Sequence, residues 1–131
     1  MTANTRPIFS EAPNLGIAQI STANTNRDGT GTIGTVLTAG ADGTRVNRIV
    51  IKATVTTSAG IIRLYIKDGG TWYLWKEIKV TAITVSSTVT GFEYEIKLAG
   101  EDALVLESGQ LLGASTHNAN TFNVIAYGGD Y

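Results

Sequence analysis

Apolar and polar residues alternate along most of this chain with the period of two that a half-buried β-strand requires. The clearest run is residues 92–98, in which four apolar residues alternate with two glutamates and a lysine. Residues 45–55 alternate as well, except that Val46 is out of phase with the later apolar residues. A β-bulge near Asn47 would restore the register of that strand.

Two further alternating runs, residues 62–67 and 72–80, are separated by Asp68-Gly69-Gly70. An Asp-Gly pair between two such runs predicts an antiparallel hairpin. In the first strand, Arg63, Tyr65 and Lys67 are expected to face outward. In the second, the inner set is expected to be Trp72, Leu74, Ile78 and Val80, and the outer set Tyr73, Trp75, Glu77 and Lys79.

Shorter strands are predicted at residues 17–21, 33–38, 103–106, 111–116 and 122–127. Those at 103–106 and 111–116, with a turn between them, are expected to form a second tight pair. About eight strands result, with no helical period and no internal repeat. This pattern predicts an all-β protein, an antiparallel β-sandwich of which a jelly roll is one form.

The N-terminal segment differs from the rest, because residues 2–13 contain both prolines and lack a sustained alternation. The sequence therefore predicts an extended arm over residues 1–13 and one sandwich domain over residues 14–131. One interpretation is a frayed terminus. The other is an arm that reaches a neighbouring subunit, with Ile8 and Phe9 as its apolar anchors.

Composition narrows the possible functions. The absence of cysteine excludes disulfides, zinc-thiolate sites and a cysteine nucleophile. Ten basic and eleven acidic residues are scattered and give a net charge of −1, which disfavours nucleic-acid binding and permits close self-association. Neither a signal peptide in the first ten residues nor a run of eighteen apolar residues is found, so no membrane segment is expected.

One loop resembles the opening of a calcium-binding loop. Residues 24–29 place Asn, Asn and Asp at alternate positions before a glycine. The twelfth position of such a loop needs a bidentate glutamate, but Thr35 stands there and Asp28 is the only carboxylate. An ordinary Asx-rich turn is the favoured interpretation, and no metal or cofactor is predicted.

Catalytic candidates are few. His117 is the only histidine, and no sequence motif supplies it with a nucleophile or an orienting acid. Glu93 and Glu95 share one face of a predicted strand, but nothing nearby in the sequence would raise the pKa of either carboxyl. Both glutamates are expected to face solvent, and the chain is expected not to be an enzyme.

The most informative side chains are three aromatic residues, Tyr65, Tyr73 and Trp75, which the alternation places on the outside of the predicted hairpin. Exposed aromatic residues are enriched in protein interfaces and also form stacking platforms for sugars. A third possibility is that the predicted orientation is inverted, in which case these residues belong to the core or its rim.

The residues of three segments also carry a resemblance to a known family. These are the polar arm at residues 2–13, the run Asn47-Arg-Ile-Val-Ile-Lys-Ala53, and the closing run from Ala114 to Ala126. In these segments the chain resembles the small Thr- and Gly-rich β proteins of tailed bacteriophages, including capsid decoration or cement proteins. The likeness lies in the sequences of short strand segments rather than in a chemical motif, so it transfers no site residue.

That resemblance implies a virion protein assembled in the cytoplasm of a bacterial host. It would form a trimer or another ring, sit on the major capsid protein, and contact its neighbours through the arm and loops. A tail or neck position stays open. The alternative function is a carbohydrate-binding β-sandwich that uses Trp75, Tyr73 and Tyr65.

Overall fold

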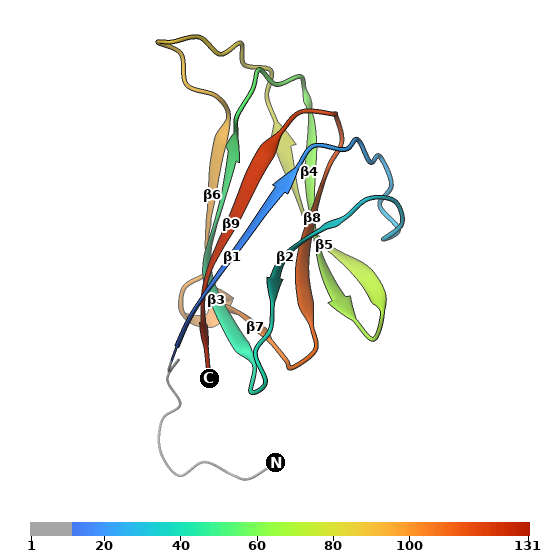
Figure 1. Cartoon of the computed structure of the whole chain (residues 1–131), viewed down its shortest axis with the longest axis vertical. Helices are drawn as coiled ribbons and strands as arrows, with labels where there is room; N and C mark the ends of the chain where they lie inside the picture. The colour runs from blue at the N-terminus through green and yellow to red at the C-terminus, as the bar shows by residue number, and fades with distance from the viewer. Residues whose placement is uncertain (1–11) are drawn as a thin grey trace.

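The computed structural model describes residues 12–131, which form two antiparallel β-sheets packed against each other (Figure 1). One sheet has the order β1-β9-β3-β6, with β7 also paired to β3, and the other has the order β2-β8-β4-β5. A short 3₁₀-helix at Gly100–Asp102 precedes β7. The strands are β1 (Ala12–Ile20), β2 (Gly34–Thr38), β3 (Thr44–Ala53), β4 (Gly60–Asp68), β5 (Thr71–Val80), β6 (Glu93–Lys97), β7 (Leu104–Leu106), β8 (Leu111–Thr116) and β9 (Phe122–Asp130).

The strand pairs are nested. β4 pairs with β5 at the centre of the chain, β3 pairs with β6, β2 with β8, and β1 with β9. Successive pairs in this series lie in alternate sheets, which is the connectivity of a jelly roll. The predicted antiparallel β-sandwich is therefore confirmed, with nine strands in the described residues rather than about eight.

Two local predictions are confirmed. The β4–β5 hairpin turns through Gly69 and Gly70, whose φ angles of 62° and 89° suit a two-residue turn that residues with a side chain rarely adopt. In the pairing of β3 with β9 the register shifts between Val46 and Arg48, so Asn47 is the extra residue of a β-bulge.

The predicted pairing of residues 103–106 with 111–116 is wrong. β7 pairs with β3, whereas β8 lies between β2 and β4 in the other sheet. β6 covers only the Arg48–Lys52 part of β3, so the Thr44–Val46 part is free to pair with β7. The turn after β7, closed by a 3.0 Å hydrogen bond from the Gln110 amide to the Glu107 carbonyl, leads the chain into the opposite sheet.

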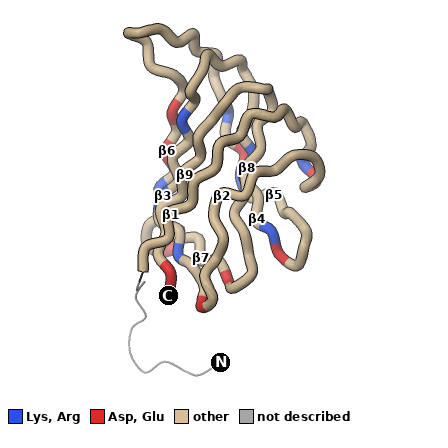
Figure 2. The backbone as a smooth tube through the Cα atoms, in the orientation of Figure 1, with Lys and Arg blue, Asp and Glu red and all other residues tan. Residues whose placement is uncertain are grey.

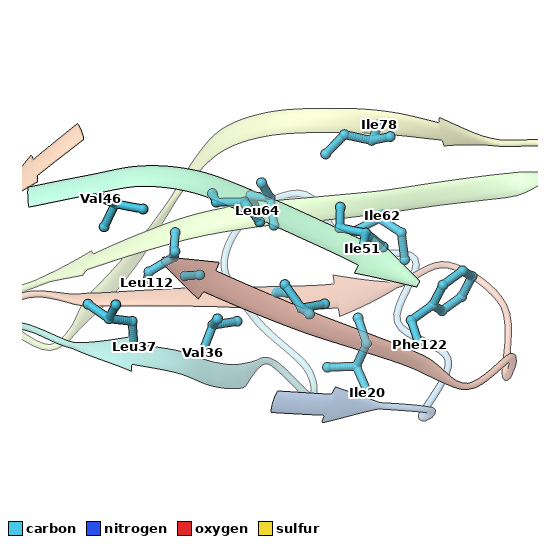
Figure 3. Packing of buried hydrophobic residues seen from close by; sticks show 14 of the residues in the cluster. Ile20, Val36, Leu37, Val46, Ile51, Ile62, Leu64, Ile78, Leu112 and Phe122 are labelled. Carbon is cyan, nitrogen blue, oxygen red and sulfur yellow. The ribbon is translucent and has the colours of Figure 1, made fainter. Parts of the chain in front are cut away.

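The core lies between the two sheets and is built from the inward-facing aliphatic and aromatic side chains of both (Figure 3). Phe92 and Phe122 meet edge to face at one end, with ring centroids 6.3 Å apart. Other members of the core include Ile20, Val36, Leu37, Val46, Ile51, Ile62, Leu64, Ile78 and Leu112.

Strand β1 begins before the predicted domain boundary. Ala12 and Pro13 already pair with Asp130 and Gly129 of β9, so these two residues belong to the sheet rather than to an arm. Ile8 and Phe9, the predicted anchors of the arm, lie outside the described residues.

Strand β1 also packs closely against β2 of the other sheet. A Cβ atom added to Gly16 would lie 2.3 Å from the Val36 carbonyl oxygen and 2.6 Å from the Leu37 Cβ. The next inward residue of β1 is Ala18, which is also small. At Gly16 and Ala18 the inward side of β1 therefore has room only for small residues, and backbone contact closes this part of the sandwich.

We expect Gly16→Ala to destabilise the protein by about 1–3 kcal/mol, because the new methyl group meets a backbone carbonyl that cannot turn aside. Urea denaturation monitored by tryptophan fluorescence measures the change. Ser21→Ala is the control, since Ser21 directly follows β1 and is exposed. Equal stability of Gly16→Ala and the wild type would show that β1 and β2 can separate without cost.

Candidate interaction surface

The structure separates the three aromatic residues that the sequence places together. Tyr73 is exposed, with 57% of its surface accessible, whereas Tyr65 is completely buried. Trp75 is half-buried and packs against the core. The prediction that Tyr65 lies on an exposed surface is therefore wrong, and the three side chains do not form one exposed platform.

Tyr65 does point away from the core, but a loop covers it. The β1–β2 loop, residues 21–33, folds over the outer side of β4, where the Tyr65 hydroxyl donates a 2.8 Å hydrogen bond to the Asn26 carbonyl. Arg63, which is also buried, donates to the Asn24 carbonyl at 3.2 Å and pairs with Glu77 at 3.2 Å. This loop gives the sheet a second, partly polar layer.

A β-bulge that the sequence analysis missed explains Trp75. In the pairing of β4 with β5, Leu64 faces Lys76 but Tyr65 faces Leu74, so Trp75 is the extra residue. The bulge inverts the orientation of the residues before it, because one inserted residue shifts the two-residue period. The prediction that residues 72 and 74 face the core is accordingly wrong, whereas Ile78 and Val80, beyond the bulge, are buried as predicted.

Trp72 confirms this inversion. Its ring lies beside Tyr65, edge to face with centroids 6.5 Å apart, and Lys67 lies 5.4 Å from the Trp72 centroid. A Cβ atom on Gly113 of β8 would come within 2.6 Å of the Trp72 ring. Trp72 thus packs on the outer side of this sheet, where Gly113 leaves space for it.

The loop that resembles a calcium site is held by its own polar groups. The Asn24 amide nitrogen donates to the Thr30 and Thr32 carbonyls at 3.0 Å each, and its oxygen accepts from the Asn26 amide. Asp28 accepts from the Thr30 amide and hydroxyl, and these bonds lower the pKa of its carboxyl. The arrangement is that of Asx turns, as the sequence favoured. No group of three or more potential metal ligands is found within residues 12–131.

The remaining candidate residues have ordinary partners. The Nδ1 atom of His117 lies 3.5 Å from the guanidinium of Arg63, itself paired with Glu77. Glu93 and Glu95 face outward from β6 as predicted, and their carboxylates lie 3.9 Å from Lys52 and 2.9 Å from Arg48.

A small polar pocket of about 100 Å³ lies at the end of β1, lined by residues that include Gln19, Thr32 and Ser115. The Ser115 hydroxyl is buried and has no hydrogen-bond partner among residues 12–131. Ligand pockets commonly enclose roughly 300 Å³ or more. This pocket therefore has room for water, of which each molecule occupies about 30 Å³, rather than for a sugar ring.

Several exposed apolar side chains lie together on the outer side of the β1-β9-β3-β6 sheet. Cross-strand partners in an antiparallel sheet share a face, so the pairing register gives its composition. One row across the sheet is Ile17, Ile125 and Val50, and the adjacent row begins with Leu15 and Tyr127. We call these five residues the outer apolar face.

Leu15, Ile17 and Tyr127 of this face are 54%, 62% and 39% exposed, and Val50 and Ile125 are half-buried. β1 has no charged residue and β9 has only Asp130, and these strands are accordingly almost entirely tan in Figure 2. This face was not predicted from the sequence, because the predicted strand began at residue 17 and its residues were assigned to no side. The alternation Leu15-Gly16-Ile17-Ala18 was the available signal.

Charged side chains border the face toward β6. Arg48 pairs with Glu95 at 2.9 Å, and its guanidinium also lies 4.9 Å from the centroid of the Tyr127 ring. Lys52 and Glu93 form a second, longer pair at 3.9 Å. The border of the apolar face therefore carries pairs of opposite charge.

A polar joint lies at the end of the same sheet, on its inward side. Asp130 of β9 accepts hydrogen bonds from the Asn14 side chain of β1 at 2.9 Å and from the Thr44 hydroxyl of β3 at 2.6 Å. These bonds favour the charged carboxylate and lower the pKa of Asp130 below its ordinary value, the Thr44 bond having the larger effect. Asn14 also donates to the Thr38 carbonyl of β2 at 3.0 Å, so the joint links both sheets.

Comparison with known proteins finds no family model that matches this sequence and no curated protein with a significant match. The resemblance to phage decoration proteins therefore stays a prediction. Within residues 12–131 no helix has the length and apolar character that crossing a membrane requires.

We expect Tyr65→Phe to lower the free energy of unfolding by about 1 kcal/mol, because the Asn26 carbonyl loses its buried donor. Faster amide hydrogen exchange in residues 21–33 should accompany the loss, since the hydroxyl holds this loop. Tyr73→Phe is the matched control, because it removes a hydroxyl from an exposed tyrosine. Unchanged exchange in the loop of Tyr65→Phe would mean that other contacts fix it.

The Asp130 joint predicts a dependence on pH. A folded pKa below the unfolded value of about 3.8 stabilises the protein above that pH, and the effect disappears as the pH falls through the folded pKa. Asp130→Asn should therefore be less stable than the wild type near neutral pH, and the difference should narrow below pH about 4. Urea denaturation across this range measures it, with Asp42→Asn in an exposed turn as the control. A difference independent of pH would contradict the assignment.

Proposed function

We propose that the chain is a non-enzymatic structural protein of a tailed-phage virion, which binds the head lattice and stabilises it as a homo-oligomer, a trimer by the resemblance. Its partners would be other copies of itself and the major capsid protein, with assembly in the host cytoplasm. The single observation that best supports an assembly role is the outer apolar face, which exposes large side chains on a sheet whose opposite side already forms the core. Exposed apolar patches of this kind mark interaction surfaces.

The fold is compatible with this proposal, since jelly rolls are frequent in viral capsid domains. The outer apolar face lies on the solvent side of a sheet, and open apolar surfaces suit contact with another protein better than capture of a small molecule. The β1–β2 loop covers β4 of the other sheet. Hydrogen bonds from Arg63 and Tyr65 hold this loop in place, so it offers a second fixed surface for contact.

The alternative function, carbohydrate binding, has narrower support. Jelly rolls also occur as lectin domains, and Tyr73 on the β4–β5 hairpin is an exposed aromatic ring. Tyr65 is buried, however, and Lys76 lies over the half-buried Trp75 at 5.1 Å from its ring centroid. A sugar platform would therefore depend on Tyr73 and its neighbours alone. Glycan binding that Tyr73→Ala abolishes would favour this alternative.

The test is made on particles of a tailed phage whose genome carries this gene. We expect purified heads to contain the chain at a fixed ratio to the major capsid protein, measured by quantitative mass spectrometry. Heads that lack it should lose their DNA at a lower temperature, and added protein should restore the wild-type temperature. A variant lacking residues 2–11 should bind such heads less tightly, because the predicted arm anchors Ile8 and Phe9 are removed.

The control for binding is Val89→Ser, which removes an exposed apolar side chain from a loop outside the sheets. Absence of the chain from purified particles would overturn the virion role. Its recovery with tails rather than heads would overturn the head position, and equal thermal release of DNA with and without it would overturn the stabilising role.

A further inference from the structure

We propose that the outer apolar face is a contact between copies of this chain, in which the face of one copy packs on the same face of another. This inference rests on the proposed function in so far as it names the surface by which the assembling protein associates with itself.

The direction of the β1 side chains is the first reason. In a sheet with one solvated side the large apolar residues normally point inward and the polar residues outward. β1 has the opposite arrangement, because its inward residues Gly16 and Ala18 are small whereas Leu15 and Ile17 point outward. The close approach to β2 explains the small inward residues, but no contact among residues 12–131 requires the large outward ones.

The second reason is the continuity of the surface. Ile17, Ile125 and Val50 are partners across three neighbouring strands, and Leu15 and Tyr127 are partners in the adjacent row. Cβ atoms of such partners lie roughly 5 Å apart, so the five side chains form one patch. A second sheet can cover a patch of this shape at the usual spacing of about 10 Å between packed sheets.

Charge favours a second copy over a partner of opposite sign. The cations bordering the patch, Arg48 and Lys52, are already paired with Glu95 and Glu93 of the same sheet. Lys97, the partner of Arg48 across β6, adds one cation that forms no ion pair within residues 12–131, and this excess is too small to select a strongly acidic partner. Another copy carries the same paired border, and a net charge of −1 gives little repulsion between copies.

The size of the patch sets the expected strength of the contact. It spans three strands, and stable interfaces bury about 800 Å² on each partner, which is more than five side chains supply. We therefore expect association through this face to depend on protein concentration.

The test uses Ile17→Cys, which gives one thiol on the face because the chain has no cysteine. Cysteine is itself a small apolar residue, so the contact should persist. The rate of reaction with a thiol reagent is measured over a range of concentrations, together with the absolute mass by light scattering. We expect the rate to fall severalfold as the mass rises to that of a dimer, the state that contact between two identical faces produces. Val89→Cys in an exposed loop should react at one rate throughout.

A second variant covers the case of an oligomer that does not dissociate. Ile17→Ser should lower the mass toward that of the monomer without changing the far-ultraviolet circular dichroism, since Ile17 makes no part of the core. A monomer mass for the wild type at every concentration would overturn the inference. So would protection of Ile17→Cys in a monomer, which would indicate cover by the protein's own residues 1–11.

These outcomes are separate from those of the particle experiment. A chain found on phage heads whose Ile17→Cys thiol reacts freely at all concentrations would keep the virion role and overturn the self-contact. A protected thiol in a protein absent from particles would support the self-contact and overturn the virion role.

Discussion

The close approach of β1 to β2 is the constraint on which the arrangement of this protein depends. Because Gly16 lies against the Val36 carbonyl, the two sheets meet along this side by backbone contact rather than through large side chains. Strand β1 can then contribute little apolar volume to the core until Ile20 at its end. Its large residues, Leu15 and Ile17, lie on the other side of the sheet, so one packing requirement creates both the sealed edge and the outer apolar face.

The two sheets differ in how their outer sides are completed. On β4, polar hydrogen bonds from Arg63 and Tyr65 fasten the β1–β2 loop as a second layer, so buried polar groups find partners inside the chain. On the β1-β9-β3 surface, the described residues provide no such layer, and the apolar side chains remain exposed. The asymmetry explains why aromatic residues on the first sheet are poor interaction candidates and why aliphatic residues on the second are better ones.

Sequence alternation predicted the sheet class, most strands, the central hairpin and the bulge at Asn47, since each is a local consequence of period and turn chemistry. It failed where distant segments decide the outcome. Burial of Tyr65 depends on a loop some forty residues away, at Asn26, and the partners of β7 and β8 depend on which edges β6 leaves free. The bulge at Trp75 had a local signal, since Lys76 interrupts the predicted inner row. The apolar face required the strand to be extended back from Ile17 to Leu15, and only the pairing with β9 places Tyr127 and Ile125 beside these residues.

The nested pairing has a consequence for the order of events during synthesis. β1 has its partner in β9, and Ala12 pairs with Asp130, so β1 cannot pair until almost all of the described chain has been synthesised, whereas β3 and β6 of the same sheet can pair earlier. The β4–β5 hairpin needs only neighbouring residues and can form long before. Leu15 and Ile17 thus leave the ribosome early on an unpaired strand, and a partner surface built on them exists only once translation has passed β9.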